Sequence, residues 1–561
     1  MNTSKPIHKL IFFKSFQDHF RKILNFYIDY FGIDIDQRSF RKYLKTNRIN
    51  QIRESQDIVA IVLIESLQIA SNNVALSLFL DSYSNLHKIQ LRAYRMMEIQ
   101  KLTKLKAHIR HRFSILWALG AKKLLICGYF ANQSKDDTNK VFYSEINTLD
   151  KLEDFQIKGI HIGDLIYDLY LTRMRSHTVD FENPEFWKIF NECLAYFTFW
   201  ISYFEKNKVK AICISHCVYN FAIPARIAIS FGVEVFQVQS EAIHRLDKDN
   251  IHAYLNSKSL KREIDLVPNE SLNKGLIISK SKLAQRFTGN YVEELELSTG
   301  VAFRPHKPPL INSATYSEKL KILIATHDFF DAVHFFGKGF YPDFHAWIKA
   351  LSEISHDVDY EWFIKTHPDA RGSMPELVHD IAEQSNNWRI LPTSTSHYEI
   401  FDLGIDLVLT VHGTIATEYP YFEIPVMNAT KNNPHSAFDF SITPESREEY
   451  EYLLSNLVKQ KGVLKSKNVS DYQTAIDRYF FGRHILTLKS WIFEDYGTYL
   501  KDLGGWNNSM SKSVYRYYLS GTNQILKADQ QYALNQFITS NDIRLERRHF
   551  PSNSSVNMYS R

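Results

Sequence analysis

Four short apolar segments between residues 320 and 428 constrain the fold of this chain more than any other feature of its sequence. The segments are 320–326, 360–366, 388–391 and 406–411. Between them lie stretches with helical patterns, including apolar residues at helical spacing over 344–351 and a capping-box spacing at Ser396 and Glu399. Strands that alternate with helices predict a parallel sheet. This part of the chain is therefore predicted to be an α/β domain.

Polar side chains follow three of these predicted strands. His327 follows the first, Lys365 and His367 end the second, and His412 begins a His-Gly-Thr turn after the last. Ligands of parallel α/β sheets bind outside the carboxyl ends of the strands, so a ligand site is expected here. The histidines have structural alternatives, because His327 and Asp328 could cap a helix and His367 precedes a proline that could end its strand.

The last of these turns has the composition of a phosphate site. Gly413 permits a close backbone approach, and the turn from His412 to Thr414 stands between a predicted strand and a predicted helix. Its N–H groups and the helix N-terminus could face a phosphate, while Lys365 and His367 would supply a cation and a donor. Glu418 lies one turn into the predicted helix.

A second α/β region precedes the first in sequence. Its five predicted strands are 58–64, 87–93, 124–127, 211–215 and 233–238, and a helix is expected over 219–231 with Gly232 at its end. A chain of 561 residues exceeds one ordinary core. The predicted division is a helical extension (1–55), a Rossmann-like domain (56–242), an irregular linker (243–316), a second Rossmann-like domain (317–440) and a C-terminal helical segment with its tail (441–561), the last folding back across the domains.

Composition excludes several classes. The net charge of +5, from 67 basic and 62 acidic residues, does not indicate nucleic-acid binding. Four cysteines without a Cys-x-x-Cys pair fit a reducing, cytoplasmic setting. No segment approaches the roughly 18 apolar residues that span a bilayer. Helical faces over 12–31, or the tail with Arg544, Arg547 and Arg548, could rest on a membrane surface or simply be packed or solvated.

No metal or cofactor is expected. Asp-x-Asp triplets begin at Asp34, Asp247 and Asp357, but none follows a predicted strand so as to present an ion to a pyrophosphate. A zinc site at Cys213, His216 and Cys217 would lack a fourth ligand. The Gly-x-Gly-x-x-Gly and Walker A sequences are also missing, which disfavours nicotinamide, flavin and kinase chemistry.

Several segments together resemble a known family. Residues 325–334, 364–369, 411–418 and 424–426 look like the C-terminal donor domain of bacterial capsule and O-antigen glycosyltransferases of the GT-B fold, and 162–170 and 215–219 resemble their acceptor domain. The His-Pro and His-Gly-Thr elements are similar to those of β-Kdo transferases, which use CMP-Kdo. The matches span about residues 55–430. Single elements also occur in UDP-sugar 2-epimerases and teichoic-acid polymerases.

The resemblance implies a GT-B enzyme whose two Rossmann-like domains face a cleft, with helical extensions at both ends. It would transfer a sugar, possibly Kdo, from a nucleotide sugar to a growing capsule or lipopolysaccharide glycan, with inversion and without metal. UDP and GDP sugars remain alternative donors, and a 2-epimerase or a non-catalytic assembly factor remain alternative functions. The expected donor-binding residues are His327, Lys365, His367, His412, Gly413, Thr414 and Glu418.

The general base for the acceptor hydroxyl is sought in the first domain. Asp164 and Asp168 are four residues apart and would share one helix face; alternatively they are a helix cap and a solvated residue. His216 follows a predicted strand and is a third candidate, unless it is a core histidine. The expected acceptor-binding residues, after the strand that ends near Gln239, are Glu241, His244 and Arg245.

Overall fold

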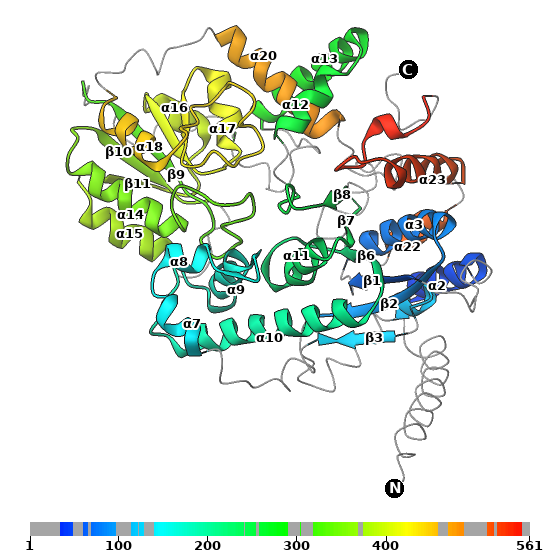
Figure 1. Cartoon of the computed structure of the whole chain (residues 1–561). Helices are drawn as coiled ribbons and strands as arrows, with labels where there is room; N and C mark the ends of the chain where they lie inside the picture. The colour runs from blue at the N-terminus through cyan, green and yellow to red at the C-terminus, as the bar shows by residue number, and fades with distance from the viewer. Residues whose placement is uncertain are drawn as a thin grey trace.

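The computed structural model contains two mainly parallel β-sheets, each covered by helices, and a small antiparallel pair, β4 (Gln156–Ile157) with β5 (Ile160–His161) (Figure 1). It describes residues 34–48, 60–65, 69–96, 114–121, 123–127, 140–240, 242–253, 257–289, 303, 318–367, 374–386, 388–457, 469–486, 513–520 and 524–552. We call the six-stranded sheet with its helices the N-terminal lobe and the five-stranded sheet with its helices the C-terminal lobe. Two parallel sheets of this kind confirm the predicted α/β class with two Rossmann-like units.

The sheet of the N-terminal lobe has the order β3-β2-β1-β6-β7-β8. Its strands are β1 (Ala60–Glu65), β2 (Ile89–Arg95), β3 (Lys123–Ile126), β6 (Val209–Ile214), β7 (Glu234–Val238) and β8 (Ile243–Leu246). The first five confirm the strands predicted from apolar runs. Only β8 pairs antiparallel, at the edge of the sheet. The near-continuous apolar run of β1 is buried along its length, as strands covered on both faces require.

The sheet of the C-terminal lobe has the order β11-β10-β9-β12-β13, and all of its pairs are parallel. Its strands are β9 (Lys321–Ala325), β10 (Glu361–Lys365), β11 (Trp388–Leu391), β12 (Leu407–Thr410) and β13 (Val426–Asn428). Four confirm the predicted strands; the three-residue β13 was not foreseen. Its helices are α14 (Phe344–Ser355), α15 (Met374–Gln384), α16 (His397–Asp402), α17 (Ile415–Glu418) and α18 (Arg447–Ser455). The capping box predicted at Ser396 and Glu399 is formed at the start of α16.

Seven helices of the N-terminal lobe lie among the described residues. They are α3 (Ala70–Leu86), α5 (Ser114–Ala118), α7 (Lys140–Glu145), α8 (Leu149–Glu153), α9 (Gly163–Met174), α10 (Pro184–Lys206) and α11 (Ile223–Ser230). Helix α10 begins with an Asn183 cap and a proline in its first turn, and buries an aromatic stripe that includes Trp200. The helix predicted over 219–231 starts with a 3-10 turn, Tyr219–Ala222, and ends before Gly232, whose φ is +69°.

The predicted irregular linker over 243–316 is wrong where the structure describes it. Strand β8 opens this region, and the helices α12 (Ser257–Asp265) and α13 (Asn269–Phe287) follow. Their apolar residues are buried with those of α20 (Val469–Phe480) and the π-helical residues Phe481–Leu486. Because the packing partner lies about 200 residues further along the chain, local periodicity alone gave little sign of it.

The C-terminal segment returns to the N-terminal lobe, as expected. Helices α22 (Ser513–Leu519) and α23 (Gln524–Thr539) pack against α2 (Ile35–Arg48) and α3, and one core cluster contains residues of all four (Figure 1). Arg516 forms an ion pair with Asp36 on α2. Among the helices that the structure describes, none is both long and apolar enough to traverse a lipid bilayer.

Candidate functional site

The carboxyl ends of the two sheets face each other. The Tyr219 hydroxyl, beyond the end of β6, donates to Asp331 Oδ1 at 2.6 Å in the loop after β9. The Thr172 hydroxyl on α9 donates to the Phe330 carbonyl of the same loop at 2.8 Å. Tyr219 holds a positive φ of 54°, a backbone strain that the surrounding structure must sustain. The strand-end residues of both lobes are therefore brought to one interface.

His327 and His412 stack on this edge of the C-terminal lobe, with ring centroids 4.6 Å apart. The backbone N–H groups of Val411 and His412 both donate to His327 Nε2 at 3.3 Å, so Nε2 is the unprotonated nitrogen of that ring. Burial and the neighbouring His412 lower the pKa of His327 well below its ordinary value. His327 is thus a neutral ring that fixes the turn after β12.

His412 is half-buried among aromatic rings. Phe336 meets its ring edge-on with centroids 5.0 Å apart, and Phe344 lies 5.5 Å away. Burial lowers the pKa of His412 to about 4, so it is neutral at physiological pH and offers an N–H donor rather than a charge.

Gly413 is required by the turn geometry. A Cβ atom at this position would lie 2.8 Å from Thr410 Oγ1 and 3.3 Å from the His327 ring. The helix predicted after this turn is short: α17 has four residues. The side chain of its N-cap residue, Thr414, makes no capping hydrogen bond. The expected contribution of a helix N-terminus to anion binding is corrected accordingly, since a macrodipole needs more aligned peptides.

Lys365 and His367 stand at the end of β10. Lys365 is half-buried, and burial lowers the pKa of its ammonium group. The N–H of His367 donates to Thr326 Oγ1 at 3.3 Å, which ties the end of β10 to the end of β9. These residues lie at the same end of the sheet as the turn of His412 but two strands away, because β9 lies between β10 and β12.

Glu418 already has a partner. Arg286 Nε donates to its carboxylate at 2.6 Å, and both side chains are buried. Burial raises the pKa of Glu418 although Arg286 acts in the opposite direction. His397 Nε2 lies 3.8 Å from the second carboxylate oxygen. The sequence analysis missed Arg286 because α13 fell within the predicted linker. Its place in the last turn of a helix, where basic residues are favoured, was the available signal.

Asp164 forms a closed ion pair within the N-terminal lobe. Both of its oxygens accept from Arg226, each at 2.6 Å, and both side chains are buried. Burial alone would raise the pKa of Asp164, but the guanidinium holds it well below its usual range. Asp164 is not the helix cap that was weighed as an alternative, because Ile162 occupies that position.

Asp168 is buried between the lobes rather than solvated. Its Oδ1 lies 2.6 Å from His334 Nδ1, and the backbone N–H of His334 donates to its Oδ2 at 3.3 Å. On the other side of the ring, His334 Nε2 is 3.4 Å from Glu153 Oε1. Burial would lower the pKa of His334, but the two carboxylates together raise it well above its ordinary value. A charged histidine of the C-terminal lobe therefore joins two acids of the N-terminal lobe.

His216 alone among the three base candidates remains accessible. Its side chain is exposed, yet enough protein surrounds it that desolvation lowers its pKa, with Asp331 acting in the opposite direction. A lowered pKa leaves the imidazole neutral near pH 7 and able to accept a proton.

The structure gives the expected acceptor residues different surroundings. His244 is buried, and its backbone forms an isolated antiparallel β-bridge with Arg544 of the C-terminal segment. Arg245 donates to the carbonyls of Phe537, Ile538 and Ser540. Both residues thus hold the returning segment against β7 and β8. Glu241 lies outside the described residues.

Glu65 is a polar strand-end residue that the sequence analysis did not select. It ends β1, is buried, and its Oε2 accepts from both the N–H and the hydroxyl of Ser215, each at 2.6 Å. An acidic residue directly after the most apolar run of the domain was the signal for it. This contact fixes the backbone one residue before His216.

Comparisons with known proteins leave the family open. No family model and no curated protein matches the chain. Among solved structures it is similar to the UDP-GlcNAc 2-epimerase of Neisseria meningitidis bound to UDP-GlcNAc, with 9% identity, 75% of this chain and 97% of that chain covered, and a TM-score of 0.22. It is also similar to HepE from Anabaena in complex with UDP and glucose, with 10% identity, 80% of this chain and 100% of that chain covered, and a TM-score of 0.24. A third similar structure is the UDP-GlcNAc 2-epimerase of Methanocaldococcus jannaschii in complex with UDP-GlcNAc and UDP, with 12% identity, 75% of this chain and 98% of that chain covered, and a TM-score of 0.24. Scores this low support no argument about function.

Proposed function

We propose that this protein is a glycosyltransferase of the GT-B type. The observation that carries the proposal is the contact of Tyr219 with Asp331, which sets the carboxyl ends of two parallel sheets against each other. Each sheet binds ligands at that edge as a rule, so the arrangement suits an enzyme with one substrate on each lobe. Four of the segments that resemble capsule and O-antigen glycosyltransferases begin at or directly after carboxyl ends of strands: 215–219, 325–334, 364–369 and 411–418.

The donor belongs on the C-terminal lobe. Lys365, His367 and the turn from His412 to Thr414 offer a cation and hydrogen-bond donors to the phosphate that a nucleotide sugar leaves behind. His327 positions the turn through its Nε2. Glu418, expected to hold ribose or sugar hydroxyls, is buried against Arg286 and could do so only if that ion pair opened. The proposed donor is CMP-Kdo, with UDP and GDP sugars as alternatives, and the proposed product is a bacterial capsule or lipopolysaccharide glycan. The reaction would occur in the cytoplasm, with peripheral contact to the inner membrane.

His216 is the proposed general base. Asp164 and Asp168 are sequestered by Arg226 and His334, so neither carboxylate is available to an acceptor hydroxyl without breaking a buried pair. His216 is accessible, neutral and next to the loop that bears Asp331. Direct attack by the deprotonated acceptor would then invert the anomeric centre, with no covalent intermediate.

Replacing His216 with glutamine tests this role. Loss of a general base should lower turnover by about 10²–10⁴-fold, while stabilisation by the nucleotide persists because the donor lobe is unchanged. His379→Gln, at an exposed histidine of α15, is the matched control and should retain full turnover. Normal turnover in His216→Gln would exclude this residue as the base.

Thermal-shift measurements with CMP, UDP and GDP test the donor assignment. A nucleotide at 100 times its dissociation constant should stabilise the fold by about 2.7 kcal/mol. Conversion of a UDP sugar to its 2-epimer in the absence of any acceptor would instead establish the epimerase alternative.

A further inference from the structure

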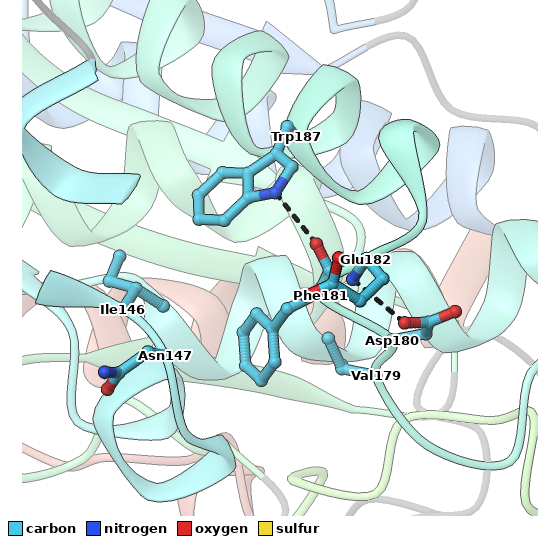
Figure 2. A pocket seen from close by; sticks show the side chains of 7 residues that line it. All are labelled: Ile146, Asn147, Val179, Asp180, Phe181, Glu182 and Trp187. Atoms are coloured by element: carbon cyan, nitrogen blue, oxygen red, sulfur yellow. Dashed lines mark hydrogen bonds between the residues drawn. The ribbon is translucent and has the colours of Figure 1, made fainter. Parts of the chain in front are cut away.

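A surface pocket lies on the N-terminal lobe, lined by residues that belong to no strand. It has a volume of about 560 Å³, within the range of small-molecule sites. The walls come from the connection between α7 and α8, the segment before α10, and the first turn of α10 (Figure 2). The described residues that line it are Ile146, Asn147, Val179, Asp180, Phe181, Glu182 and Trp187.

The apolar part of this pocket is held in place. Trp187 Nε1 donates to the Phe181 carbonyl at 3.0 Å, so the polar edge of the indole is satisfied within the protein (Figure 2). The rings of Phe186 and Phe190 pack against it with centroids 4.8 and 5.5 Å away. Trp187 remains half-buried, as does Phe181. Two aromatic side chains are thereby presented to the pocket with little entropy left to lose.

The polar part of the pocket is acidic. Asn147, Asp180 and Glu182 are exposed, and no Lys, Arg or His is among its described lining residues, although Lys151 Nζ donates to Asn147 Oδ1 at 2.9 Å from outside the pocket. Asp180 Oδ1 accepts from the Glu182 N–H at 2.9 Å, which leaves its other oxygen and the Glu182 carboxylate as acceptors. Such a rim repels phosphates and acidic sugars, and accepts hydrogen bonds from hydroxyl groups.

We propose that this pocket binds neutral sugar residues of a glycan. A pyranose ring has one apolar face, which matches Trp187 and Phe181, and an edge of hydroxyl groups, which can donate to the carboxylates and accept from the Asn147 NH₂ group. Charge complementarity favours uncharged hexoses or N-acetylhexosamines over sialic-acid-like sugars or nucleotides.

The position of the pocket indicates how a bound glycan would serve the enzyme. Directly before Val179, the Thr178 hydroxyl donates to Asp343 Oδ2 of the C-terminal lobe at 2.6 Å, and the rings of His177 and His345 lie 4.5 Å apart. The pocket therefore adjoins the junction of the lobes. We assign it the role of an accessory site for a distal part of the acceptor, a role that rests on the proposed function, whereas binding itself does not.

Binding is measured by isothermal titration on the full chain without donor. Chitotetraose and cellotetraose are the neutral probes, and an α2,8-linked sialic-acid tetramer is the anionic probe. Glu182→Gln should weaken neutral-probe binding about tenfold, because a hydrogen bond to a charged acceptor exceeds a neutral one by roughly 1.4 kcal/mol. Asn147→Ala should also weaken it, and both lie on the surface. Glu205→Gln, exposed near the other end of α10, is the matched control and should bind normally.

The outcomes separate the two claims. The pocket assignment is overturned if neither neutral tetramer binds or if the protein prefers the anionic tetramer. It is also overturned if Glu182→Gln binds the neutral tetramers as tightly as the wild type does. If the protein binds neutral tetramers but transfers no sugar, the glycan site stands and the proposed enzyme activity falls. With transfer active, Glu182→Gln should raise the KM for long acceptors and leave that for short ones unchanged; equal KM values would overturn the accessory role.

Discussion

Two sets of polar side chains near the proposed site differ in whether they are paired within the protein. One set is the carboxylates of α9, and the other is the strand-end residues His216, Lys365 and His412. Asp164 and Asp168 are fully engaged by a cation or a charged histidine. His216, Lys365 and His412 keep solvent-accessible surface and form no ion pair with any residue that the structure describes. The difference teaches that a carboxylate on a helix near a site contributes to architecture as readily as to chemistry.

Asp164→Asn gives the largest expected effect on stability. The substitution leaves Arg226 buried with a neutral partner, and breaking a buried ion pair costs about 3–5 kcal/mol of unfolding free energy. Urea denaturation measures this loss. Asp249→Asn, at an exposed pair with Lys248, is the control and should change stability by less than about 1 kcal/mol. An unchanged midpoint for Asp164→Asn would show that the pair is not closed in solution and return Asp164 to the list of bases.

His334→Gln tests the contact between lobes through its pH dependence. Because the folded-state pKa of His334 is raised, its stabilisation is complete below the unfolded value of about 6.5 and is lost as pH rises through the folded pKa. The difference in unfolding free energy between wild type and variant should be about 3 kcal/mol at pH 6 and shrink in alkaline buffer. The charged or titratable groups that face it are Glu153, Tyr167, Asp168, His252 and Lys338. If the difference in unfolding free energy stays constant or grows with pH, His334 is not cationic in the folded protein.

His412→Ala tests the strand-end residues that keep solvent-accessible surface. Loss of one preorganised donor should weaken nucleotide binding or slow transfer on the order of 100-fold, with the fold intact. His367→Ala is expected to behave in the same way. His356→Ala is the control, because this exposed residue ends α14 at the opposite edge of the sheet. Should His412→Ala bind nucleotide as the wild type does, the turn after β12 would not be the donor site.

Chelation is expected to have the smallest effect. Transfer should survive EDTA, because the acidic triplet that follows a strand, Asp247–Asp249, comes after the antiparallel β8 and so lies at the end of the sheet opposite the proposed site. Within the described residues, the one cluster with metal-ligand geometry is His379, Asp380 and Glu383, exposed on α15. Activity that disappears in EDTA and returns with magnesium or manganese would require metal ligands in the proposed donor site.

Local sequence was enough to predict the strands of both sheets except β8 and β13. Apolar runs such as 60–65 and 321–325 are buried on both faces, and burial of that kind imposes a continuous apolar pattern that needs no knowledge of the partner. The capping box at Ser396 is equally local. The fold class and the strand-end location of the candidate donor residues followed from these short-range signals.

Side-chain roles depended on contacts between distant segments. Asp164 meets Arg226, Asp168 meets His334, and Glu418 meets Arg286, over separations of 62, 166 and 132 residues. No pattern within a helix reveals which carboxylate will be neutralised, because the ion pair forms only after both segments are packed and desolvated. Sequence periodicity reports which face of an element is buried; tertiary structure alone decided which buried charges found a partner and which polar groups were left for a ligand.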